Sequence, residues 1–138
     1  MAYFKDADEV YAVLGKFFRE LAEDEEISTQ FHSANTIVRY EYANPEAVIT
    51  LRLQPGEPGD VDCGESEMEP EVTMSMDADI AHLFWLGKVN VSVAMARGQI
   101  KASGPVAKIL KLVPLTKPVF PRYKAQLERE GLTEMANA

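Results

Sequence analysis

Residues 87–104 read Gly-Lys-Val-Asn-Val-Ser-Val-Ala-Met-Ala-Arg-Gly-Gln-Ile-Lys-Ala-Ser-Gly, and this stretch carries the most information about the fold. Asn90 is a residue type that begins helices, and Gly98 is one that ends them. The valines at 89, 91 and 93 alternate with polar residues, which favours a strand by propensity alone. A short strand Gln99–Ala102 follows, and Gly104 stops it before Pro105.

Helical patterns lie on both sides of this stretch. Asp77 is placed to cap an apolar helix that Gly87 ends. Pro105 begins a further helix with an apolar stripe, and Pro114 is expected to end it. A last helix is predicted from Pro118 to Glu130, and residues 132–138 are expected to fray.

The N-terminal half begins with helices and continues with strands. Asp6 and Glu9 have the spacing of a capping box, and apolar residues recur at helical spacing from Val10 to Leu21. A shorter helix contains Ile27 and Phe31. From residue 36 the period changes to two, which predicts a hairpin around Asn44-Pro45. Further strands are predicted at 61–63, within an acidic loop over 54–71, and at 72–76.

Length and composition are those of one globular domain over residues 1–138. Hydrophobic residues make up 46% of the 138 residues and charged residues 26%, too apolar for a disordered chain. The N-terminal sequence lacks a basic segment followed by an apolar run, so a cytoplasmic location is expected. The single cysteine, Cys63, is compatible with a reducing compartment.

Charge is distributed unevenly along the chain. The net charge of -8 argues against nucleic acid as a partner. Residues 1–86 hold 5 basic and 19 acidic side chains, whereas residues 87–138 hold 9 basic and 3 acidic ones. The basic residues of this C-terminal third are either solvated faces of amphipathic elements or a surface for transient contact with an anionic membrane.

No constellation of residues predicts catalysis, a metal site or a cofactor. His32 and His82 have no metal-ligand spacing around them: His32 lies on the second predicted helix, and His82 is expected at the surface beside Asp79. Acidic neighbours are expected to raise the pKa of the Cys63 thiol. We therefore predict a protein that is not an enzyme. Apolar residues of the last helices exceed what one buried face per helix needs, and Met74, Met76 and Met95 are flexible enough to line a pocket; an ordinary core is the alternative.

The order and spacing of Asp77–Gly104 resemble the sterol carrier protein type 2 family. The matching positions are Gly87, Asn90, Ala94, Gly98, Ile100, Lys101 and Gly104. The resemblance favours a helix between Asn90 and Gly98. It implies an α+β fold, with a five-stranded, mostly antiparallel sheet covered on one face by about five helices and enclosing an apolar tunnel.

The resemblance also implies a function and a binding site. Such a domain binds or transfers a fatty acid, acyl-CoA or sterol-like lipid without chemistry of its own. The residues expected to line the tunnel are Phe84, Trp85, Met95, Ile109, Leu110, Val113 and Phe120. The long acidic loop and the final Met-Ala-Asn-Ala depart from the family pattern and argue for a lipid other than sterol, as in a prokaryotic-type member. The alternative function is an accessory or dimerisation module that supports an enzyme or a lipophilic-metabolite pathway, and a homodimer is left open.

Overall fold

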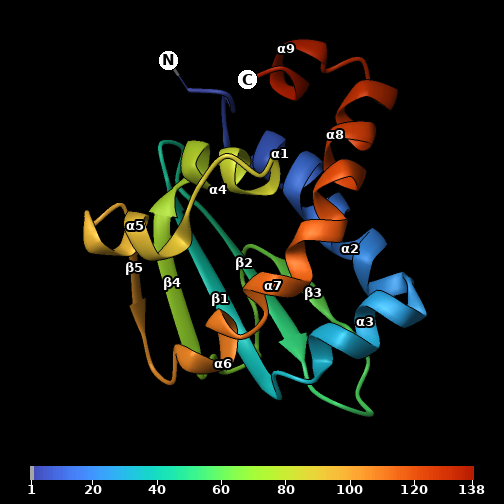
Figure 1. Ribbon diagram of the computed structural model, residues 1–138, viewed down its shortest axis with the longest axis vertical. Helices are drawn as coiled ribbons and strands as arrows, with labels where there is room; N and C mark the ends of the chain where they lie inside the picture. The colour runs from blue at the N-terminus through green and yellow to red at the C-terminus, as the bar shows by residue number, and fades with distance from the viewer. Residues whose placement is uncertain (1) are drawn as a thin grey trace.

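Five strands form one sheet in the computed structural model, which describes residues 2–138 (Figure 1). The strands are β1 Thr36–Ala43, β2 Ala47–Leu53, β3 Val61–Cys63, β4 Val72–Asp77 and β5 Ile100–Ser103. Their order is β3-β2-β1-β4-β5, and every neighbouring pair is antiparallel except β1 and β4. The predicted α+β fold with a mostly antiparallel sheet is confirmed.

The two faces of the sheet differ in chemistry because side chains alternate along each strand. Tyr40 of β1 pairs with Ile49 of β2 and with Met74 of β4, so these apolar side chains share one face. Arg39 pairs with Thr50 and Thr73, which places polar side chains on the opposite face. Buried residues on the apolar face mark it as the side that packs against the helices.

The N-terminal helices begin as their capping residues predict. α1 Ala7–Val10, the π-helical segment η1 Tyr11–Gly15 and α2 Lys16–Glu23 follow one another without a break. The Asp6 carboxylate accepts a hydrogen bond from the backbone N–H of Glu9 at 2.9 Å. The Glu9 carboxylate accepts from the N–H of Lys5, one residue outside the expected capping box. α3 Glu25–His32 is capped by Asp24, which accepts from Ile27.

The conflict of patterns around Asn90 is resolved in favour of a helix. α5 Val91–Ala96 begins where the Asn90 side-chain oxygen accepts from the N–H of Val93 at 3.1 Å. Gly98 follows the helix with a φ of 74°, a conformation that glycine adopts without strain. The local hydrogen bond at the cap therefore outweighs the strand propensity of the valines.

One expected cap is wrong in detail. α4 Ala78–Trp85 starts directly after Asp77, as predicted, but the Asp77 side chain makes no hydrogen bond to the helix. Its carboxylate instead accepts from the Asn44 side-chain amide at 3.1 Å. Asp77 therefore links the start of α4 to the β1–β2 turn.

The segment after β5 differs from the prediction at its prolines. The expected single helix from Pro105 is two short helices, α6 Ala107–Leu110 and α7 Val113–Thr116. Pro114 lies in the first turn of α7 rather than ending a helix, because the first turn does not need its missing N–H. The 3-10 segment η2 Lys117–Val119 then leads into α8 Phe120–Arg129.

The C-terminal residues 132–138 also differ from the prediction of a frayed end. They contain the helix α9 Thr133–Ala136, in which Met135 and Ala136 are buried. The backbone carbonyl of Met135 contacts the His82 imidazole, so α9 packs against α4. Within residues 2–138, no helix is both long and apolar enough to cross a membrane.

Candidate functional site

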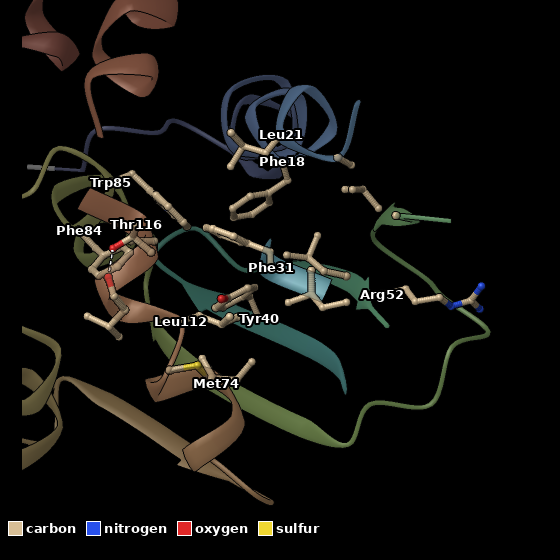
Figure 2. A pocket seen from close by; sticks show the side chains of 18 of the residues that line it. Phe18, Leu21, Phe31, Tyr40, Arg52, Met74, Phe84, Trp85, Leu112 and Thr116 are labelled. Carbon is tan, nitrogen blue, oxygen red and sulfur yellow. Dashed lines mark hydrogen bonds between the residues drawn. The ribbon is translucent and has the colours of Figure 1, made fainter. Parts of the chain in front are cut away.

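A cavity of about 100 Å³ lies between the apolar face of the sheet and the surrounding helices. Figure 2 shows side chains entering it from α2, α3, α4 and α7 and from the strands. The side chains labelled there are Phe18, Leu21, Phe31, Tyr40, Arg52, Met74, Phe84, Trp85, Leu112 and Thr116. Nearly all of the lining is apolar, so bound water would find few hydrogen-bonding partners inside.

Stacked aromatic residues form the floor of the cavity. The rings of Phe18 and Tyr40 stack with their centroids 5.9 Å apart, and those of Tyr40 and Tyr42 are 6.0 Å apart. Burial raises the pKa of Tyr40 to about 12 and that of Tyr42 well above its ordinary value. Both phenols are therefore neutral at physiological pH, and the floor carries no charge.

One end of the cavity is closed by an aromatic cluster around Trp85. The indole packs edge-on against Phe17, Phe18 and Phe84, with centroid distances of 5.2, 5.7 and 4.9 Å. Trp85 is only 6% exposed, and it belongs both to this cluster and to the lining. A ligand in the cavity would therefore contact the only tryptophan of the chain.

The polar residues of the lining come mainly from α3, the end of β2 and the segment before β3. The guanidinium of Arg52 forms an ion pair with Asp60 at 2.9 Å, and 46% of the Asp60 side chain is exposed. In Figure 2 the guanidinium of Arg52 points away from the apolar side chains. This end of the cavity therefore reaches solvent and presents charge at its mouth.

A serine and a histidine also meet at the lining. The Ser28 hydroxyl lies 3.2 Å from Nε2 of His32, one turn along α3. A nucleophilic serine needs a base that is itself oriented by a third group. Among residues 2–138, no side chain or carbonyl forms a hydrogen bond with Nδ1 of His32, so the third member of such a triad is missing.

The structure brings together five of the seven side chains that were expected to line a tunnel. Phe84 and Trp85 from α4, Ile109 and Leu110 from α6, and Val113 from α7 all line the cavity. The flexible methionines Met74 and Met76 of β4 line it as well.

The other two expected residues lie outside the cavity lining. Met95 is half-buried on α5. Phe120 packs edge-on against Phe84 with a centroid distance of 5.6 Å. It therefore contacts a lining residue without lining the cavity itself. Whether the lining residues bind a ligand stays a prediction.

Sequence reasoning missed the contribution of the N-terminal half to the lining. Phe18 and Leu21 of α2, Ile27 and Phe31 of α3, and Tyr40 of β1 all face the cavity. The helical and alternating patterns identified the apolar side of each element. These patterns do not show where the apolar side chains of different elements leave a space unfilled.

The expectation that His82 lies at the surface is wrong. His82 is fully buried, with Nδ1 2.7 Å from the Tyr123 hydroxyl and Nε2 2.9 Å from the Met135 carbonyl oxygen. Burial lowers the pKa of its imidazole. Asp79 does not pair with it but accepts from the backbone N–H of Tyr3. His32 is also buried, against Gly59. His82 of α4 therefore contacts α8 and α9, and His32 of α3 packs against the segment before β3.

The described residues offer no metal centre, and Cys63 is not activated. No group of three or more His, Cys, Asp or Glu side chains within residues 2–138 could hold a metal ion. The pKa of the Cys63 thiol is raised, as expected, but the main cause is burial, with Asp62 a smaller contribution and Arg19 opposing it. The Cys63 sulfur lies so close to Gly15 that a Cβ added there would come within 2.6 Å of it. This contact explains why residue 15 of the helix has no side chain.

Comparison with known proteins agrees with this architecture. A sequence profile of the SCP-2 sterol transfer family matches residues 15–117. No curated protein sequence matches this chain.

Solved structures share the fold at low sequence identity. Sterol carrier protein 2 from Yarrowia lipolytica, in its apo form, is 20% identical, with a TM-score of 0.62 over 75% of this chain and 87% of that one. Sterol carrier protein domain 2 of Helicoverpa armigera is also 20% identical, with a TM-score of 0.64 over 81% and 88%. The ubiquinone synthesis protein UbiJ-SCP2 is 16% identical, with a TM-score of 0.55 over 80% and 87%.

Proposed function

We propose that this chain, which belongs to the SCP-2 sterol transfer family, acts as a single non-catalytic domain that binds one lipid acyl chain in its cavity and carries it through water. The observation that carries the proposal is a space closed by aromatic and aliphatic side chains at one end and bordered by an exposed ion pair at the other. Such a space suits a ligand with an apolar tail and a polar head.

The size of the cavity favours a slender ligand. Its volume of about 100 Å³ has room for at least roughly seven to ten water- or methylene-sized groups. It is smaller than the roughly 300–1,000 Å³ of pockets that enclose drug-sized molecules. A flexible acyl chain fits such a narrow space, whereas a rigid sterol ring system requires the surrounding helices to move. A fatty acid or the acyl part of acyl-CoA is therefore the proposed ligand class.

A displacement series tests the proposal. A fluorescent fatty acid is bound to the purified protein and displaced by saturated fatty acids of increasing chain length, by an acyl-CoA and by cholesterol, with native mass spectrometry to count the bound molecules. We expect displacement at one site, an affinity that rises with chain length until the cavity is filled, and weak displacement by cholesterol. Absence of any bound lipid and of any displacement would overturn the proposal, and strong displacement by cholesterol would overturn the acyl-chain assignment.

A second candidate function is an accessory module for an enzyme or a lipophilic-metabolite pathway. The fold likeness to a ubiquinone synthesis protein supports this candidate. An accessory module requires a partner or a homodimer. Light scattering after size-exclusion chromatography therefore distinguishes the accessory module from the carrier function. A monomer at all concentrations with one bound lipid favours the carrier function, whereas a lipid-free dimer favours the accessory module.

A further inference from the structure

The segment that covers the cavity contains no acidic side chain. Between Asp79 and Glu128 the sequence has eight basic residues and no Asp or Glu. This run includes α5, β5, α6 and α7, and three of these helices contribute Val91, Ile109 and Val113 to the cavity lining. The cover of the cavity is therefore also the most positively charged part of the chain.

Three cations of this cover are free to meet an external anion. Lys108 pairs with Glu71 at 2.9 Å. Outside the cover, on α8, Arg122 pairs with Asp24 at 3.0 Å. Within residues 2–138, no ion pair involves the exposed side chains of Arg97, Lys111 and Lys117. Lys88 donates to the backbone carbonyl of Ala138. Lys101 of β5 pairs with Ser75, so its side chain lies on the opposite, polar face of the sheet. Glu71, the acidic neighbour from the strand side, is already neutralised by Lys108.

An exposed apolar side chain accompanies these cations. Val93 on α5 is 44% exposed, and no other large hydrophobic side chain of residues 2–138 is exposed to that extent. Val91, on the other side of the same helix, lines the cavity. α5 therefore contacts the cavity through Val91 and solvent through Val93, and Arg97 directly follows its last residue.

We propose that this cover, residues 88–117 with its free cations and Val93, docks on an anionic lipid bilayer. Charge complementarity supports a negatively charged surface, and the exposed valine favours a bilayer over a nucleic acid. The acidic remainder of the chain is repelled by such a surface, so the charge asymmetry orients the protein with its cavity cover toward the lipid. Each basic residue near an anionic membrane contributes about 1 kcal/mol, which is about a fivefold change in binding.

Vesicle flotation tests the docking. Phosphatidylcholine vesicles with and without phosphatidylglycerol are mixed with the protein at low and high salt. We expect binding only to the anionic vesicles, and loss of binding as the screening length falls from about 10 Å at 0.1 M salt to about 3 Å at 1 M. The double variant Lys111→Ala with Lys117→Ala is expected to weaken binding about 30-fold.

Matched controls make the result specific to the cover. The double variant Lys5→Ala with Lys124→Ala removes two exposed lysines that form no ion pair within residues 2–138 and that lie outside the cover. It changes the net charge equally, and it should bind as the unaltered protein does. Val93→Asn should weaken binding while leaving its salt dependence unchanged. Equal loss in both lysine pairs, equal binding to neutral vesicles, or binding to duplex DNA without binding to vesicles would overturn the proposal. None of these readouts needs a lipid in the cavity, so their failure is distinct from failure of the proposed function.

Discussion

The Nδ1 atom of His82 lies 2.7 Å from the hydroxyl oxygen of Tyr123, and this buried contact joins α4 to α8. The other ring nitrogen, Nε2, lies 2.9 Å from the carbonyl oxygen of Met135. Because a carbonyl only accepts, Nε2 must carry the proton and donate, which leaves Nδ1 to accept from the Tyr123 hydroxyl. Both contacts are satisfied by the neutral imidazole.

We therefore predict that the free energy of unfolding changes with pH because of the titration of His82. Burial lowers its pKa in the folded protein from the ordinary value of 6.5. As the pH falls below about 6.5 the unfolded state binds the proton first, so the free energy of unfolding decreases until the lower folded-state pKa is passed. Urea unfolding across this pH range measures the decrease, and His82→Gln should flatten it.

Two other groups titrate in a separate range. Hydrogen bonds lower the pKa of Asp24 from 3.8 and that of Glu71 from 4.5. Stabilisation from these carboxylates is present above those values and is lost only as the pH falls through the lower folded-state pKa values. An unchanged slope in the His82→Gln variant above pH 5 would contradict the role assigned to His82.

The same substitution at two leucines distinguishes a cavity from a packed core. Leu112 lines the cavity, whereas Leu127 of α8 is fully buried outside it. Leu127→Phe should lower the free energy of unfolding by about 1–3 kcal/mol, the usual cost of overpacking. Leu112→Phe should cost less because it fills existing space, yet it should reduce fatty acid binding. Chemical denaturation and displacement assays on both variants check this, and equal destabilisation would show that the space is not available.

Trp85 should report on the contents of the cavity. Its indole lines the cavity and is 6% exposed, so an acyl chain beside it changes its surroundings without unfolding the protein. We expect saturating palmitate to shift the emission of Trp85, and Leu112→Phe to weaken the shift. Met95→Phe is the control, because Met95 lies outside the lining. A spectrum that stays the same while mass spectrometry shows bound lipid would place the ligand elsewhere.

Alanine substitutions at two glycines distinguish the cost of backbone strain from the cost of a steric clash. Gly98 and Gly104 have φ values of 74° and 85°, so alanine at either position costs about 1–2 kcal/mol of conformational energy. A Cβ at Gly98 would meet open space, whereas one at Gly104 would collide with the backbone carbonyl of Glu71. Thermal unfolding should therefore show a larger loss for Gly104→Ala than for Gly98→Ala. Equal losses would mean that the backbone of Glu71 moves aside freely.

Local patterns predicted the elements well because each is specified by residues close in sequence. The alternation at Val38, Tyr40 and Tyr42 predicted β1. Around Asn90 the local patterns conflicted, and the family resemblance favoured the helix that the structure shows as α5. Pro114 was misinterpreted because a proline ends one helix or begins another with the same local chemistry.

The site was predicted less completely because it depends on contacts between distant segments. The buried state of His82 requires α9, more than 50 residues later, and α9 is too short to carry a strong periodic signal. The stacking of Phe18 on Tyr40 joins α2 to β1. Periodicity shows which way an apolar side chain points, but an unfilled volume depends on the lengths of all the side chains around it.

The parallel pairing of β1 with β4 has a consequence for the order of folding. A tight turn joins β1 to β2, whereas residues 44–71 separate β1 from β4, so the hairpin forms a local contact and the parallel pair forms a distant one. Because Met74 and Met76 of β4 belong to the lining, the cavity is complete only once this distant pairing has formed. If the cavity binds a lipid as proposed, we expect that lipid to lack a binding site in the partly folded chain, and therefore to slow unfolding rather than speed folding.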